Sequence, residues 1–106
     1  MAYVQLGGKS IEIDDHGFML QPESWDDSVA SDLALREEGI TSLNEDHWKI
    51  VRYLRGYYLQ FKAAPMIRRL CKDTGIGLKQ IYELFPSGPA RGACKIAGLP
   101  KPTGCV

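Results

Sequence analysis

The chain has 106 residues, of which 44% are hydrophobic and 25% are charged, and this composition is typical of one globular domain. No apolar run approaches the roughly 20 residues of a membrane-spanning helix, and the N-terminal stretch lacks the charged and apolar regions of a signal peptide, so we expect a cytoplasmic protein. Three cysteines are too few, and odd in number, for a secreted disulfide framework.

The first elements predicted along the chain are short strands. Residues 3–6 and 10–13 are rich in apolar and β-branched side chains and flank Gly7-Gly8, a pattern typical of a β-hairpin. Residues 18–20 could add a third strand. So few strands are not stable alone, so they must pack on helices.

Helical segments follow the strands. Capping residues, apolar periodicity and Gly or Pro stops place four of them at 24–39, 42–61, 65–75 and 78–85. Ser24 is the expected cap of the first helix. The second is expected to begin at a capping box of Ser42 and Glu45, or at Asn44 instead. This second helix is apolar on two sides and is therefore predicted to be central.

Residues 65–85 resemble a helix-turn-helix motif with an exposed basic side. Lys79 and Gln80 would be the residues able to read bases, although a tight helical corner is the simpler interpretation, and the net charge of zero argues against strong phosphate binding. The predicted fold class is α+β and mainly α. It consists of a small N-terminal β-hairpin or meander on a helical bundle with a helix-turn-helix-like corner.

A last short helix is predicted over residues 88–97, followed by a flexible C-terminal arm. The arm, residues 98–106, follows a single globular domain of residues 1–97, and its glycines and prolines disfavour helix and strand. An extended chain spans about 3.3–3.6 Å per residue, which gives Cys105 a reach of roughly 25 Å. Such a thiol could enter a partner's cleft and return to Cys94 at the base of the arm. The residues that define the arm are Gly98, Pro100, Pro102 and Gly104.

The Cys94–Cys105 pair therefore indicates a mobile redox or sulfur carrier, with a structural disulfide and incidental thiols as the alternatives. Acidic side chains are concentrated in residues 1–46, and none follows Glu83, so cations near the two cysteines are expected to favour the thiolate. The carboxylate on Val106 opposes this at Cys105, so the expected net effect is modest. The cations expected to assist are Arg91, Lys95 and Lys101.

The remaining thiol and the histidines predict no site. Cys71 is expected to be a buried, inert thiol and the slowest of the three to react, after Cys105 and Cys94. His16 lies in a predicted turn and His47 at the start of a helix, and their spacing does not predict the four convergent ligands that zinc needs. We therefore expect no bound metal.

The C-terminal residues closely resemble the DsrC/TusE family, the family of the gamma subunit of dissimilatory sulfite reductase. The segments that carry the resemblance are residues 82–90 and 93–106, and the likeness extends through the N-terminal half at 15–18, 25, 46–50 and 64–65, so that it covers nearly the whole chain. The resemblance implies a small β element on a helical bundle. It also implies no cofactor bound by this chain, since the sirohaem and iron–sulfur cluster belong to the partner reductase.

The resemblance further implies a mechanism and partners. Cys105 would enter the reductase formed by the alpha and beta subunits and accept sulfur from partly reduced sulfite. Cys94 would then close on it as a trisulfide, which a membrane-bound electron-transfer complex reduces to sulfide. The chain would thus be a sulfur-carrying co-substrate and not an autonomous catalyst.

Two other functions stay open from the sequence. One is a persulfide carrier in a sulfurtransferase relay, for sulfur oxidation or tRNA thiolation. Within the family that the sequence resembles, the members of the tRNA-thiolation relay keep only the penultimate cysteine, so the presence of both Cys94 and Cys105 favours the sulfite-reductase type. The other is a thiol-sensing DNA-binding regulator built on the helix-turn-helix-like corner.

Overall fold

The computed structural model describes residues 2–100 of the chain. It begins with the predicted hairpin, in which β1 (Ala2–Leu6) pairs antiparallel with β2 (Lys9–Ile13). Gly7 and Gly8 have positive φ angles of 59° and 77°, as a two-residue hairpin turn with right-handed strand twist requires. The expected third strand is reduced to a single bridge between Ile13 and Met19.

Helix α1 (Asp27–Glu38) follows the short 3-10 helix η1 (Pro22–Ser24). The prediction that Ser24 caps α1 is wrong, because Ser24 lies inside η1. Asp26 is the cap, and its carboxylate accepts a hydrogen bond of 2.9 Å from the Val29 N–H. The predicted stop is confirmed, since Gly39 closes the helix with a φ of 68°.

Helix α2 (Glu45–Phe61) begins at Asn44, the second of the two caps considered. Asn44 Oδ1 accepts from the His47 N–H at 2.9 Å, and His47 Nδ1 accepts from the Asn44 N–H at 3.0 Å. Two backbone donors are thereby satisfied reciprocally, with a histidine in the position where Glu or Gln is usual. Ser42 does not cap the helix.

The helix-turn-helix-like corner consists of α3 (Ile67–Thr74) and α4 (Leu78–Leu84), joined by residues 75–77. Gly75 ends α3 with a φ of 73°, as the sequence predicts. The helix starts later than Pro65, because Met66 is its N-cap. Among the described residues, no helix is long and apolar enough to cross a membrane.

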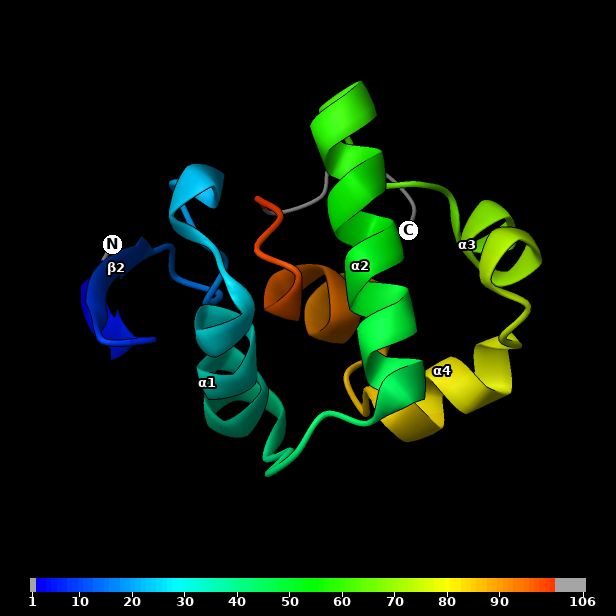
Figure 1. The fold of residues 1–106 in the computed structure, drawn as a ribbon, viewed down its shortest axis with the longest axis horizontal. Coiled ribbons are helices and arrows are strands. Elements are labelled where there is room, and N and C mark those ends of the chain that lie inside the picture. Colours follow the sequence, from blue (N-terminus) through cyan, green and yellow to red (C-terminus); the bar gives the residue numbers. More distant parts are fainter. Residues whose placement is uncertain (1, 101–106) are drawn as a thin grey trace.

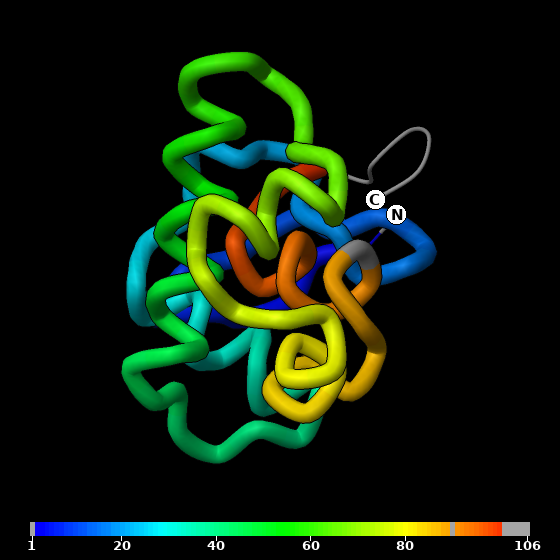
Figure 2. The backbone as a smooth tube through the Cα atoms, turned by 90° about the vertical axis from the view of Figure 1, so that its right-hand side faces the viewer, coloured from blue at the N-terminus to red at the C-terminus, as the bar shows by residue number. Residues whose placement is uncertain are grey.

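The last helical segment is the π-helix η2 (Pro89–Cys94), which continues helically through residue 96. Figure 1 shows η2 beside the long helix α2, with α1 and the hairpin on one side of α2 and the α3–α4 corner on the other. The view turned by 90° places η2 near the middle of the molecule (Figure 2). Its small residues allow this close packing, and Ala93, Cys94 and Ala97 are all buried.

These elements share one apolar core. Helix α2 contributes three fully buried side chains, and α1 and the hairpin close the core from the other side. The principal members are Leu6, Ile11, Val29, Leu33, Ile50, Val51, Leu54, Ile81, Phe85, Ile96 and Leu99. The inclusion of Ile96 and Leu99 means that the core extends to the end of the described chain.

Candidate functional site

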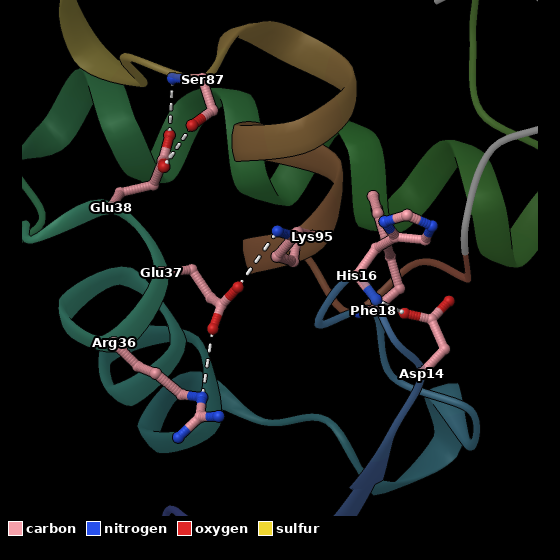
Figure 3. Close-up of polar contacts among 8 residues, drawn as sticks. All are labelled: Asp14, His16, Phe18, Arg36, Glu37, Glu38, Ser87 and Lys95. Carbon is pink, nitrogen blue, oxygen red and sulfur yellow. Dashed lines mark hydrogen bonds and ion pairs between the residues drawn. The ribbon is translucent and has the colours of Figure 1, made fainter. Parts of the chain in front are cut away.

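The site is built around Cys94, the last residue of η2. Gly88 is the N-cap of η2 and has a φ of 88°. Helical turns of the π type are rare in proteins, and where they occur they are often at functional sites. Gly92 is needed for the close packing, because a Cβ there would lie 2.6 Å from Glu38 Oε1 and 3.0 Å from Phe85 Cβ. Glu38 is in turn held by the Ser87 N–H and hydroxyl, at 2.9 and 2.7 Å (Figure 3).

Cys94 is a free thiol with no exposed surface. Burial raises the pKa of its thiol to about 12, because a thiolate would lose its hydration there. At neutral pH the described state therefore holds Cys94 as a protonated, inaccessible thiol. The expectation that neighbouring cations favour the thiolate is wrong for this residue.

The surroundings of Lys95 explain why its positive charge does not favour a thiolate at Cys94. Its ammonium lies 3.1 Å from Glu37 Oε1 and 5.2 Å from the centre of the Phe18 ring, and only 12% of its side chain is exposed. Figure 3 shows Glu37 between Lys95 and Arg36, whose Nε lies 3.1 Å from Oε2. The stretch after Glu83 lacks carboxylates in sequence, but α1 supplies one in space. Glu37 was not anticipated, because nothing near it in sequence points to Lys95.

The other predicted site residues fall into two groups. Arg91 is an exposed residue of η2. Lys101, Pro102, Gly104 and Cys105 lie outside the described residues, so their assigned roles stay predictions. The distance between the Cys94 and Cys105 sulfurs is likewise outside what the structure describes.

The first residues of the predicted arm are packed. The Gly98 N–H donates to the Lys95 carbonyl at 3.0 Å, and the Leu99 N–H donates to the Cys94 carbonyl at 3.1 Å. With the positive φ of Gly98, 75°, these bonds form a Schellman motif at the end of the helix. Leu99 is only 1% exposed, whereas Pro100 is half-buried. The predicted boundary at residue 98 is therefore placed too early, and the domain includes Gly98 and Leu99.

Two side chains from distant parts of the chain hold this end of the helix. Trp25 Nε1 donates to the Ile96 carbonyl at 2.8 Å. The guanidinium of Arg55 lies 4.8 Å from the centre of the Trp25 ring and also reaches backbone carbonyls. Burial lowers the pKa of Arg55 from its ordinary value, although it stays charged. Sequence reasoning placed Trp25 only within the family resemblance and did not single out Arg55, because periodicity marks these two positions merely as apolar and solvated.

Cys71 and His47 play other parts. Cys71 lies half-buried in α3, whereas Cys94 is fully buried. The expectation that Cys71 is a buried thiol, less accessible than Cys94, is therefore wrong. His47 Nδ1 accepts from the backbone, and the distance of 2.9 Å from Nε2 to the Leu84 carbonyl makes Nε2 the donor. Nδ1 thus completes the cap of α2, and Nε2 holds α2 to the end of α4. Within residues 2–100, no three metal-binding side chains converge.

The basic surface of residues 65–85, considered above for DNA binding, is partly neutralised by a carboxylate. Arg69 Nε lies 3.3 Å from Asp73 Oδ2, which also accepts from the Tyr53 hydroxyl at 2.5 Å. The Gln80 amide donates to Asp46 at 3.1 Å. Of the two residues expected to read bases, Gln80 is therefore engaged within the molecule.

Comparisons with known proteins agree with this architecture. The family model described as "DsrC like protein" matches residues 5–106. The chain belongs to the DsrC-like family. This family match and the relatives described next confirm both the family resemblance and the predicted fold class.

This DsrC-like chain is 51% identical to the dissimilatory-type sulfite reductase subunit gamma of Nitratidesulfovibrio vulgaris, over 106 residues that cover 100% of both chains. It is 42% identical to the sulfurtransferase TusE of Escherichia coli strain K12, covering 93% of this chain and 95% of that one. The oxidized gamma subunit of Archaeoglobus fulgidus has the same fold, with a TM-score of 0.86 and 46% identity over 98% of this chain and 99% of that one.

Proposed function

We propose that this chain is a sulfur-carrying protein co-substrate of dissimilatory sulfite reductase. It would accept sulfite-derived sulfur on its C-terminal cysteines and deliver it for reduction to sulfide. The observation that carries the proposal is the position of Cys94, a free thiol at the end of η2 that Cys105 follows eleven residues later in the sequence. Full-length similarity to a sulfite reductase gamma subunit supports it.

The chemistry balances with two thiols and the electrons of the partner reductase. Two electrons and four protons convert sulfite to a sulfur(II) species, S(OH)₂, and one water. The Cys105 thiol condenses with that species, forming an S–S bond, breaking an S–O bond and releasing water. The product is a hydroxylated sulfur on Cys105.

The Cys94 thiol then attacks this sulfur. A second S–S bond forms, the remaining S–O bond breaks, and a second water leaves, which gives a trisulfide between Cys94 and Cys105. Four electrons and four protons from an electron-transfer complex at the membrane would cleave both S–S bonds, releasing hydrogen sulfide and restoring both thiols. The attacking species is a thiolate, so Cys94 must leave its buried environment during this cycle.

Single-turnover reduction of sulfite tests these roles, with the purified alpha and beta subunits and the full-length carrier. Intact mass under non-reducing conditions should show one sulfur more and two hydrogens fewer in the wild-type chain. Cys105→Ala should acquire no sulfur. Cys94→Ala should hold one extra sulfur on Cys105, as a persulfide after two further electrons from the reductase.

Cys71→Ala is the matched control, because it removes a thiol that the mechanism does not use, and it should load like the wild type. Loading of Cys105→Ala combined with no loading of Cys94→Ala would reverse the two roles. Absence of added sulfur in the wild-type chain would reject the proposal.

A sulfurtransferase relay is the second candidate, supported by the similarity to TusE. A relay member would take sulfur from a persulfide donor without any change in oxidation state and would not need Cys94. Transfer of sulfur from a persulfidated sulfurtransferase to Cys94→Ala at the wild-type rate, with no loading by sulfite reductase, would favour the relay.

A further inference from the structure

The carbonyl groups at the end of the last helix are held by side chains rather than by another helical turn. A helix leaves its final carbonyls without backbone partners. Here Trp25 Nε1 donates to the Ile96 carbonyl at 2.8 Å. The Arg55 guanidinium lies 3.4 Å from the Ala97 carbonyl oxygen and 3.5 Å from that of Gly98. Three consecutive carbonyls, those of residues 96, 97 and 98, are thus engaged by two side chains.

The same two side chains interlock with Gly98 and with each other. The Trp25 indole lies so close to Gly98 that a Cβ there would come within 2.3 Å of Trp25 Cδ1. The Arg55 guanidinium stacks on this indole at 4.8 Å, and its other nitrogen donates to the Pro22 carbonyl at 2.6 Å. Arg55 therefore ties α2, the η1 segment and the helix end together. We call Trp25 and Arg55 the clamp.

The turn held by the clamp is bonded to Cys94 and packs in the same core. Leu99 bonds back to the Cys94 carbonyl at 3.1 Å, and both residues belong to the same core cluster with almost no exposure. A sulfur carried on Cys105 cannot reach a thiol buried in this way. The packing around Cys94 must open before its thiol can form a bond to any sulfur outside the domain, and residues 95–99 are the segment next to Cys94 that the clamp holds.

We propose that Trp25 and Arg55 are positioning residues that hold residues 96–99 closed over Cys94, and that Cys94 enters the carrier chemistry only when this clamp opens. The chemical consequence rests on the proposed function, whereas the clamp itself is a property of this chain alone. The closed clamp keeps Cys94 protonated and shielded from other electrophiles. Opening it locally would expose the thiol without unfolding the rest of the core.

The reactivity of Cys94 in the full-length chain tests the clamp without any partner. After reduction, the protein is alkylated with iodoacetamide at neutral pH, and the rate is followed separately at each cysteine by peptide mass mapping. Arg55→Gln removes a charged donor from three carbonyls, so the Cys94 rate should rise about tenfold or more. Trp25→Phe keeps an aromatic ring but removes the N–H donor and part of the ring surface, so a rise of several-fold is expected.

Two controls separate local opening from general loosening. Cys71 in the same molecules should keep its wild-type rate. Arg52→Gln is the matched variant, because Arg52 also stacks on an indole, that of Trp48 at 4.9 Å, but has its ion pair with Asp27. It should leave the Cys94 rate unchanged. Amide exchange at Gly98 and Leu99 should accelerate in Arg55→Gln and Trp25→Phe, but not in Arg52→Gln.

The clamp is overturned if Cys94 alkylates at the wild-type rate in both Arg55→Gln and Trp25→Phe. It is also overturned if Cys71 accelerates as much as Cys94, since that result means global destabilisation. These outcomes differ from failure of the proposed function, which would be absence of sulfur loading in the wild-type chain whatever its alkylation rates. If both hold, the clamp variants should convert loaded sulfur to the trisulfide faster than the wild type.

Discussion

Helix α2 carries two arginines three positions apart, and each stacks on a tryptophan. Arg52 lies 4.9 Å from the centre of the Trp48 ring, and Arg55 lies 4.8 Å from that of Trp25. The stacking geometry is nearly the same, but the surroundings differ. Arg52 is exposed, with Asp27 at 2.9 Å as its ion-pair partner. Arg55 is half-buried and its other contacts are backbone carbonyls.

The difference shows that stacking on a tryptophan does not by itself determine how much an arginine stabilises the fold. A solvated pair such as Arg52–Trp48 contributes little, because water and salt screen the charge. Around Arg55 the carbonyl groups have lost water, so removal of the guanidinium would leave them unpaired. The half-buried Arg55–Trp25 pair, called the buried pair below, therefore stabilises the end of the last helix, where the candidate thiol lies.

The largest effect is expected at Gly98, where the buried pair meets the backbone. Gly98→Ala places a Cβ within 2.3 Å of Trp25 Cδ1 and forces a φ of 75° on an alanine. We expect the free energy of unfolding to fall by about 3 kcal/mol. Urea unfolding measures it. Gly75→Ala is the matched control, since its φ of 73° is similar and its Cβ would meet nothing within 4 Å; it should lose only about 1 kcal/mol. Equal losses would show that Trp25 does not press on Gly98.

The arginines themselves give the next effect. Arg55→Gln should lower the free energy of unfolding by about 2 kcal/mol, because charged hydrogen bonds to buried carbonyls are lost. Arg52→Gln should change it by less than about 0.5 kcal/mol. Parallel urea titrations of the two variants compare the pairs directly. Equal losses would remove the distinction between a buried and a solvated pair.

A pH dependence should report the burial of Cys94 beneath the clamp. Its pKa is about 12 in the folded chain and 9.0 ordinarily. Between these values the unfolded chain has released a proton that the folded chain retains, so the free energy of unfolding falls as the pH rises. The expected loss is about 1.4 kcal/mol per pH unit in that window. The slope is measured against Cys94→Ala, whose own loss with pH should be smaller. Parallel slopes would contradict the buried thiol.

The smallest effect is expected at the exposed pair. Asp27→Asn removes the charge that faces Arg52, and the free energy of unfolding should fall by less than about 0.5 kcal/mol, vanishing in 1 M salt. Thermal unfolding at low and high salt measures it. A loss of about 2 kcal/mol would mean that the exposed Arg52 pair stabilises the fold as much as the Arg55 pair does, and would contradict the comparison.

Much of the fold follows from local rules in the sequence. The hairpin turn at Gly7-Gly8 and the helix ends at Gly39 and Gly75 depend on residues within a few positions of one another. The cap of α1 was misplaced because Ser24 and Asp26 both satisfy the local pattern. In the structure Ser24 lies inside η1, whose Pro22 carbonyl accepts from Arg55 in α2, and such a long-range contact is not visible in the local pattern.

The candidate site could be predicted only in part. The C-terminal signature identifies Cys94 and the family, but not the depth at which the thiol is buried. That depth depends on Trp25 and Arg55, which are 71 and 42 positions from the carbonyls they bond. The pairing of Lys95 with Glu37 is equally distant, at 58 positions. Charge counted along the chain therefore misjudged the electrostatic surroundings of the thiol.

The most direct test of the carrier function is the intact mass of the chain taken from cells that make it and are reducing sulfite. The protein is purified anaerobically under non-reducing conditions and weighed before and after treatment with a thiol reductant. We expect a fraction with one sulfur more and two hydrogens fewer than the reduced chain, which returns to the reduced mass on treatment. A chain that carries only free thiols, or a plain disulfide with no added sulfur, would contradict the account.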